Sequence, residues 1–239
     1  MADSRKSLDK TGGANVLATS VDTFLQKVAT TPLPSHGNRR GRLLFVMDAT
    51  MSRQPTWDHA VSLQAQMFEV TADMGGLDVQ LGFFRGLGEF KVSKWMSDPA
   101  SLGRAMSGVQ VRGGHTQICR SLRHALSEAR TAPVEALVYV GDCMEEAADD
   151  VCAVAGELGL RGTRAFMFQE GYDRTAEMTF REVARLTGGA FARFDAGAAG
   201  QLRDLLRAVA VYASGGHKAL SGHARGASSA VKQLTHQVR

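Results

Sequence analysis

The sequence predicts an α/β fold: a doubly wound, mostly parallel sheet with one antiparallel edge strand and helices on both faces. Two observations carry this prediction. Apolar runs of strand length alternate with amphipathic segments of about 10–15 residues, which is typical of successive βαβ units. One further segment, after a glycine turn, alternates apolar and polar residues, which is typical of an antiparallel edge. Crossovers in such sheets are almost always right-handed, and this favours the doubly wound topology.

The composition is that of an ordinary globular chain. Of the 239 residues, 44% are hydrophobic and 22% are charged, which suits one sizeable domain with tails. No stretch approaches the roughly 20 apolar residues that span a bilayer. Residues 1–10 are charged and no apolar segment follows them, so we expect no secretory signal. Three cysteines without a CxxC pair argue against a disulfide scaffold and a thiolate zinc site, and we expect a cytoplasmic location.

The net charge of +4 is distributed unevenly along the chain. Residues 1–40 contain six Lys or Arg and three Asp, and residues 215–239 contain four basic residues and no acid. The intervening segment, 41–214, contains 18 basic and 21 acidic residues. The basic excess therefore belongs to the ends of the chain, and it gives no reason to expect nucleic-acid binding.

Three regions follow from these patterns. Residues 1–40 form an N-terminal extension in which 21–29 have helical spacing, and Pro32 and Pro34 end that helix before a basic linker. Residues 41–213 form the α/β domain. Residues 214–239 are rich in Gly, Ala and Ser and are basic, and we expect a flexible tail there.

The first half of the domain contains three predicted strands. The apolar run 43–47 ends in Asp48 and suits a strand that is buried on both faces. Pro55 opens a helix to about residue 74. The strand 79–84, a glycine turn and the edge strand 90–93 follow, and lysine is common on such exposed edges.

The second half continues the alternation. Asp98 and Pro99 start a short helix that ends near Gly108, and the glycine-rich loop 113–116 precedes the next helix. The remaining predicted elements are helix 117–130, strand 136–142, helix 147–158, strand 164–169, helix 174–187, strand 190–194 and helix 198–213. Gly188 and Gly189 stand where the penultimate helix should end.

Two strands that end in aspartate indicate where a site would lie. Ligands of open parallel sheets bind beyond the carboxyl ends of the strands, where the strand order reverses. If the two halves wind in opposite directions, the strands before Asp48 and Asp142 are neighbours, and their carboxylates meet above the sheet. The loop 113–116 would cover the same end.

The residues after the first of these aspartates add hydroxyl groups. Asp48, Thr50 and Ser52 stand at alternate positions. Two carboxylates with hydroxyl groups form a hard oxygen site, which suits Mg²⁺. Hydroxyls carry no charge, so the two aspartates only balance the ion, which can still take one anionic oxygen from outside.

This pattern resembles the metal-ion-dependent adhesion site (MIDAS) of von Willebrand factor A (VWA) domains, which reads DxSxS, then a threonine, then an aspartate. The matching residues are Asp48, Thr50, Ser52, Thr116 and Asp142, and the resemblance covers about residues 41–213. Thr50 replaces the first serine of the pattern, and a cysteine follows Asp142 where a glycine is more common.

The resemblance implies a function and a setting. In the family, the matched residues bind Mg²⁺, with Mn²⁺ or Ca²⁺ possible, and a carboxylate of a protein partner completes the shell. The whole chain is similar to stand-alone bacterial VWA proteins, which implies a cytoplasmic interaction protein, and some such proteins act alongside AAA+ ATPases.

Simpler interpretations remain for single residues. A strand-ending aspartate often caps a helix or forms a turn, and Thr116 could be the N-cap of the helix that starts at residue 117. His115 is interpreted as a loop residue and Cys143 as a structural thiol. Five acids lie between 142 and 150; they are either favourable charge at a helix N-terminus or an acidic rim.

Three functions compete. The first is a non-enzymatic module in which Mg²⁺ bridges to an acidic side chain of a partner. The second is a Mg²⁺-dependent phosphotransfer enzyme of the haloacid-dehalogenase type, but Thr50 stands where that pattern has its second acid, and no phosphate-binding loop motif is present. The third is a VWA scaffold that binds no metal.

Overall fold

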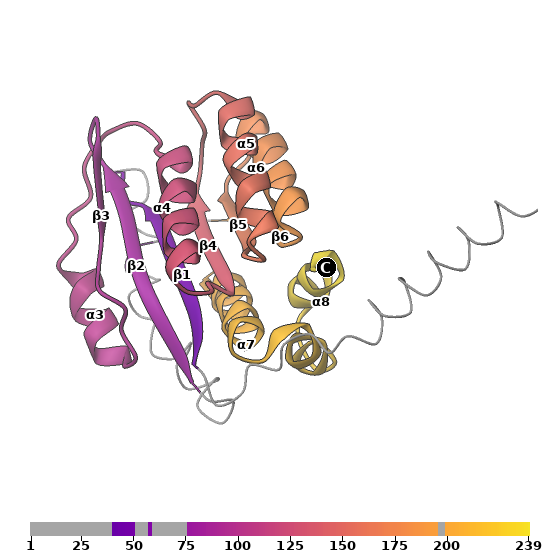
Figure 1. Ribbon diagram of the computed structural model, residues 1–239. Coiled ribbons are helices and arrows are strands. Elements are labelled where there is room, and N and C mark those ends of the chain that lie inside the picture. Colours follow the sequence, from indigo (N-terminus) through magenta and orange to yellow (C-terminus); the bar gives the residue numbers. More distant parts are fainter. Residues whose placement is uncertain (1–39, 51–56, 59–75, 196–198) are drawn as a thin grey trace, which may run out of the picture. The chain divides into compact units, whose positions relative to one another are not determined.

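Six strands form one sheet in the order β3-β2-β1-β4-β5-β6, and every pair of neighbours is parallel except β2 and β3. The computed structural model describes residues 40–50, 57–58, 76–195 and 199–239 (Figure 1). The strands are β1 (Gly41–Asp48), β2 (Leu77–Arg85), β3 (Glu89–Val92), β4 (Ala136–Gly141), β5 (Arg164–Glu170) and β6 (Ala190–Phe194). This confirms the mostly parallel sheet with one antiparallel edge strand.

Helices follow the strands as the periodicity predicts. The described helices are α3 (Pro99–Ser107), α4 (Ile118–Thr131), α5 (Ala148–Leu160), α6 (Arg174–Thr187), α7 (Ala199–Ala224) and α8 (Ser229–Gln237). The predicted helix 21–29 lies outside the described residues. So does most of the predicted helix 55–74, of which only residues 57–58 are described, and these are helical.

The strand order reverses between β1 and β4. β1 pairs with β2 on one side and with β4 on the other, and Met47 is in register with Val140. Asp48 is the last residue of β1, and Asp142 comes directly after β4. The two aspartates therefore lie at the carboxyl ends of neighbouring parallel strands, as predicted.

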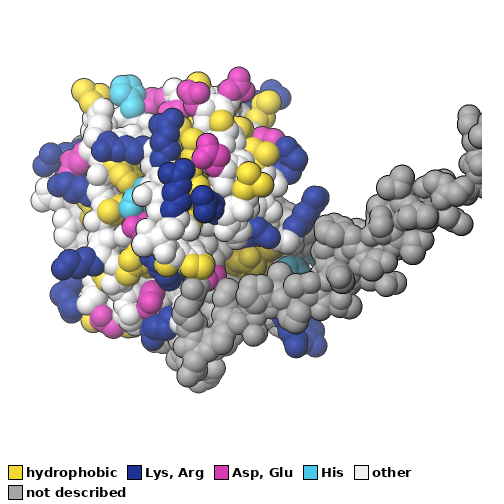
Figure 2. All heavy atoms as spheres, viewed as in Figure 1, with side chains coloured by type: hydrophobic (Ala, Val, Ile, Leu, Met, Phe, Trp, Pro, Cys, Tyr) yellow, Lys and Arg dark blue, Asp and Glu magenta, His cyan; other side chains and the backbone are white. Residues whose placement is uncertain are grey.

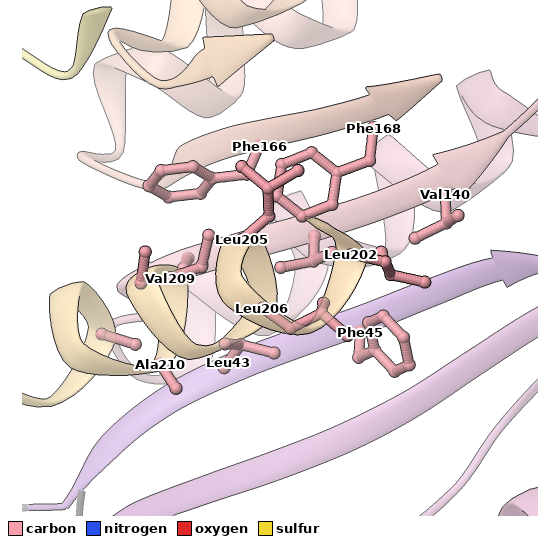
Figure 3. Packing of buried hydrophobic residues seen from close by; sticks show 14 of the residues in the cluster. Leu43, Phe45, Val140, Phe166, Phe168, Leu202, Leu205, Leu206, Val209 and Ala210 are labelled. Carbon is pink, nitrogen blue, oxygen red and sulfur yellow. The ribbon is translucent and has the colours of Figure 1, made fainter. Parts of the chain in front are cut away.

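Both faces of the sheet are covered by apolar helix faces, because strand side chains alternate between the two sides. Leu43 and Phe45 belong to one buried cluster and Leu44 and Val46 to the other. The first cluster includes α7, whose leucines pack on β1, β4 and β5 (Figure 3). The second includes α4, α5 and α6. A sheet covered on both faces explains why its strands are continuously apolar.

The predicted flexible tail is wrong. α7 continues to Ala224 through a change of direction at Gly216 (φ 67°, ψ −167°), and α8 follows. Val231, Leu234 and Val238 are buried in the core. The Gly, Ala, Ser and basic content of this segment predicted a tail, but these three apolar residues lie at helical spacing and supply a packing face.

None of the helices in the described ranges is long and apolar enough to cross a membrane.

Candidate functional site

Four chain segments meet at the carboxyl end of the sheet, and backbone hydrogen bonds join three of them. The four segments are the end of β1, the β2–β3 turn, the loop before α4 and the loop after β4. Ala49 N–H donates to the Phe84 carbonyl (2.9 Å), and the Ala49 carbonyl accepts from Arg112 N–H (3.0 Å). His115 N–H donates to the Gly86 carbonyl (3.1 Å). The loop before α4 is thus fixed to both β1 and the β2–β3 turn.

Asp48 lies at the centre of this arrangement. The residue is fully buried, and its Oδ1 accepts a hydrogen bond from the Thr50 backbone N–H (2.8 Å). This contact orients the carboxylate at the point where the chain bends after β1. A buried carboxylate in a folded protein is normally paired or coordinated to a metal.

Thr116 is bound to the loop after β4 through Glu145. Its Oγ1 accepts from the Glu145 backbone N–H (3.0 Å), while its own N–H donates to Glu145 Oε2 (3.0 Å). The residue is 6% exposed. After a hydroxyl accepts one hydrogen bond, it still has a proton to donate and a second lone pair. Thr116 can therefore still interact with a ligand.

Glu146 caps α4 from the same loop. Its carboxylate accepts from the backbone N–H groups of Ile118 and Cys119, the latter at 2.9 Å. The N-cap residue of α4 is Gln117, whose side chain makes no cap bond, so the interpretation of Thr116 as the N-cap is wrong. Glu145 and Glu146 therefore form neither an acidic rim nor the favourable charge at the N-terminus of α5. Both join the loop after β4 to the segment before α4, and Glu146 does so at the N-terminus of α4.

Close backbone contact holds the loop before α4 against the β2–β3 turn. A Cβ atom added at Gly114 would lie 2.1 Å from the Gly86 carbonyl oxygen, so only glycine fits. Arg120 Nη1 also donates to the Gly88 carbonyl (2.7 Å). Near the base of the turn, the Arg85 guanidinium binds Glu89, and this pairing lowers the pKa of Glu89 to about 2.

Cys143 reports on the electrostatics of the site. Burial, the neighbouring Asp142 carboxylate, to which the thiol is hydrogen-bonded, and Asp48 raise the pKa of Cys143 to about 12. A thiol held neutral is a poor nucleophile, in agreement with the interpretation of Cys143 as structural. Both aspartates act on the Cys143 sulfur, so the electrostatic potential there is negative.

The structure places four of the five candidate ligands at one end of the sheet: Asp48, Thr50, Thr116 and Asp142. Ser52 lies outside the described residues. Within the described part of the chain, no three His, Cys, Asp or Glu side chains form a group that could hold a metal. The candidate ligands differ from such a group, because only two of them are carboxylates and the others are hydroxyl oxygens. Metal binding by these residues stays a prediction.

His115 is exposed at the rim. Its Nδ1 lies 3.1 Å from Glu145 Oε2, the same oxygen that accepts from Thr116 N–H. The residue thus belongs to the hydrogen-bonded scaffold of the loop. The contacts through residues 145 and 146 were not predicted from the sequence, and no local pattern signals them.

No protein-family model matches the sequence, and no curated protein matches it. Solved structures are similar in fold. The SpRpn10 VWA domain is 13% identical with a TM-score of 0.51, over 72% of this chain and 95% of that domain. Proximal thread matrix protein 1 from the mussel byssus, with a zinc-occupied MIDAS motif, is 14% identical with a TM-score of 0.56, over 72% of this chain and 46% of that one.

A pilus adhesin, SpaC from Lactobacillus rhamnosus GG, is 10% identical with a TM-score of 0.58, over 77% of this chain. The match spans only 30% of the length of the adhesin. At these identities the similarity establishes the fold alone. The chain has the VWA fold, as the resemblance of its motif predicted.

Proposed function

We propose that this VWA domain is a metal-dependent protein-interaction module. A divalent cation, preferably Mg²⁺, would bind to Asp48, Thr50, Ser52, Thr116 and Asp142. The bound cation would also bind a carboxylate of a protein partner and so link the two proteins. The observation that carries the proposal is the position of two aspartates at the ends of adjacent parallel strands, beside a buried threonine on a hydrogen-bonded loop.

The described residues fit a cation on two counts. Asp48 is fully buried, and a carboxylate in that environment favours a positive partner. The two aspartates that raise the pKa of Cys143 disfavour a further negative charge there, and for the same reason they favour a cation.

The donor set indicates which kind of cation. All candidate ligands are oxygen atoms, which suit Mg²⁺, Mn²⁺ and Ca²⁺. Bound there, the metal supplies an electrophilic position that an external carboxylate can occupy. The zinc-occupied MIDAS motif of the mussel protein supports a divalent metal in this fold. The methyl group of Thr50, absent from serine, is the one departure within the ligand set.

The partner would supply one further oxygen ligand, from an accessible carboxylate. The surface around the site is mixed: Figure 2 shows acidic side chains at the upper end of the molecule, with basic and apolar side chains between them. A cytoplasmic location and a place beside an AAA+ ATPase are parts of the proposal that rest on the family resemblance alone.

We do not propose an enzymatic activity. The site offers a neutral thiol at Cys143, and Thr50 replaces the second acid that the phosphotransfer pattern requires. Turnover of a phosphate ester that needs Mg²⁺ and is lost in the Asp142→Asn variant would contradict this part of the proposal.

The first test measures binding of Mn²⁺ alone, by electron paramagnetic resonance titration, with Mg²⁺ as the competitor. We expect Asp142→Asn to weaken Mn²⁺ binding at least about tenfold, because one of two charged ligands is lost. Asp149→Asn is the matched control, since Asp149 is an exposed acid on the first turn of α5. Equal affinities for all three proteins would refute the metal site, and no binding by the natural chain would favour the metal-free scaffold.

A further inference from the structure

Leu87 lies at the tip of the β2–β3 turn, at the carboxyl end of the sheet. It is 88% exposed, although the backbone on both sides of it is held by hydrogen bonds. His115 N–H donates to the Gly86 carbonyl (3.1 Å), and Arg120 Nη1 donates to the Gly88 carbonyl (2.7 Å). The turn therefore presents a large apolar side chain to solvent from a backbone that is already fixed.

Tyr172 has the equivalent place after β5. It is 68% exposed and directly precedes Asp173, the N-cap of α6, whose carbonyl accepts from Gln169 Nε2 (2.7 Å). The Arg193 guanidinium carbon lies 4.7 Å from the centre of the Tyr172 ring, a cation–π contact that orients the ring. A second large side chain at the carboxyl end of the sheet is thus held in place and open to solvent.

The two side chains flank the candidate cation site. The site lies at the ends of β1 and β4, the central pair in the order β2-β1-β4-β5 (Figure 1). Asp48 is in register with Phe84, three residues before Leu87, and β4 ends opposite Gln169, three residues before Tyr172. Leu87 and Tyr172 therefore follow the two strands on either side of the site, at matching positions beyond the sheet.

The strand spacing sets the distance between these flanks. Neighbouring strands lie about 4.8 Å apart, so the ends of β2 and β5, separated by three such steps, are about 14 Å apart, and the site between them is about 7 Å from each. An extended chain advances about 3.3 Å per residue and points every second side chain to the same side. A segment that crosses the strand ends with one residue at the cation therefore brings the residues two positions before and after it to the two flanks.

We propose that Leu87 and Tyr172 select the partner of this site: an extended segment in which an acidic residue has one apolar residue two positions before it and another two positions after it. The inference rests on the proposed function, since the acidic residue is the one that binds the cation. Its apolar neighbours cover Leu87 and Tyr172, and this removes apolar surface from water. Little ordering entropy is lost, because both residues lie on backbone that is already held.

Charge favours the same occupant. Without a cation, Asp48 and Asp142 make the electrostatic potential at the site negative, and an acidic segment is repelled. A divalent cation balances that charge, and an acidic residue then becomes favourable at the centre. The apolar flanks alone would accept any apolar segment, whereas the flanks and the cation together require the stated spacing.

The first measurement compares two capped peptides, each added to the full-length protein in Mg²⁺ and followed by ¹⁵N NMR titration. In one peptide, a central glutamate has leucine two positions away on either side and alanine elsewhere. In the other, of the same composition, the leucines adjoin the glutamate and point to the other side. We expect the first peptide to bind about tenfold more tightly, through the apolar area that it alone can bury, and to shift the amide signals of Leu87 and Tyr172. In EDTA we expect no measurable binding of either peptide.

The second measurement repeats these titrations with Leu87→Ser and Tyr172→Ser. The preference for the first peptide should fall to about threefold in each variant, because one of the two apolar flanks is lost. Leu160→Ser is the matched control and should keep the full preference, since Leu160 is 91% exposed at the end of α5, at the opposite end of the sheet. Mn²⁺ affinity should be equal in the natural chain and the three variants, because none of the replaced residues is a candidate ligand.

The peptide and Mn²⁺ titrations separate this inference from the function on which it rests. Three results with normal Mn²⁺ affinity would overturn the inference alone: equal binding of the two peptides, no measurable binding of either, or a full preference in both Leu87→Ser and Tyr172→Ser. Absence of Mn²⁺ binding, or peptide binding that is as tight in EDTA as in Mg²⁺, would overturn the inference and the proposed function together.

Discussion

Thr116 and Glu145 bind each other twice: the Thr116 hydroxyl accepts from the Glu145 backbone N–H, and the Glu145 carboxylate accepts from the Thr116 backbone N–H, both at 3.0 Å. The pair joins the loop before α4 to the loop after β4. A candidate metal ligand is thus held by a residue that lies three positions after another candidate, Asp142. The position of Thr116 depends on this pair.

We predict that Glu145→Ala weakens Mn²⁺ binding several-fold. The Glu145 backbone still donates to the hydroxyl, but Thr116 N–H loses its acceptor and the loop is less restrained. Nearly half of the Glu145 side chain is exposed, so we expect the loss in unfolding free energy to be at most about 1 kcal/mol. Titration with Mn²⁺ and urea unfolding measure the two effects.

The control for this prediction is Glu157→Ala. Glu157 is an exposed glutamate on α5, and its carboxylate lies 3.8 Å from the Arg130 guanidinium. This variant should match the natural chain in both measurements. Equal metal affinities for Glu145→Ala and Glu157→Ala would show that Thr116 is placed without Glu145, or does not bind the metal.

Gly114→Ala should be destabilising because its Cβ would lie 2.1 Å from the Gly86 carbonyl oxygen. The two loops must then separate, at a cost of about 1–3 kcal/mol. Gly113→Ala is the control: nothing lies within 4 Å of a Cβ atom at that neighbouring position. Thermal unfolding should show a lower Tm for Gly114→Ala alone. If both variants unfold at one temperature, the contact between this loop and the β2–β3 turn is not tight.

The strands and helices were predictable because they depend on periods that short segments carry. Apolar runs mark the buried strands, and the alternation of strands with helices predicts the parallel sheet. From there, topology alone brings Asp48 and Asp142 to neighbouring strands. The location of the candidate site therefore follows from general rules of α/β sheets.

The contacts that shape the site were not predictable in the same way. Thr116 and Glu145 are 29 positions apart, and nothing local distinguishes a glutamate that binds a distant N–H from one on a solvated face. The contact of the Gln237 side chain with the Phe191 backbone has no sequence signal either, since it depends on which strand lies at the edge. The helical spacing of the apolar residues of α8, in contrast, is visible in the sequence. It was not used because the surrounding Gly, Ala and Ser residues favour a flexible segment.

Leu205→Ala tests the packing of α7 against the sheet. Leu205 is fully buried and lies beside Phe166 and Phe168 of β5 (Figure 3). Removal of its methyl groups leaves a cavity, and we expect the free energy of unfolding to fall by about 2–5 kcal/mol. Leu160→Ala is the control, because Leu160 is 91% exposed at the end of α5. Urea unfolding of both variants measures the difference, and equal losses would contradict the described core.

His124 should make the fold less stable in mild acid. Burial lowers the pKa of His124 below its usual 6.5, although Glu128 acts in the opposite direction. Its Nε2 lies 2.9 Å from Gln80 Oε1, and its ring packs against Phe90. Below pH 6.5 the unfolded chain binds a proton that the folded chain does not, so the free energy of unfolding falls as the pH falls from 6.5 toward the lowered pKa.

The test of this linkage is urea unfolding at pH 7.5 and pH 5.5 for the natural chain, His124→Gln and His217→Gln. The His124 variant cannot gain that proton, so its free energy of unfolding should fall less between the two pH values. His217 is exposed on α7, and its variant should lose as much stability as the natural chain. An equal loss in all three proteins would mean that His124 binds its proton as readily in the folded state as in the unfolded one, against the effect of its burial.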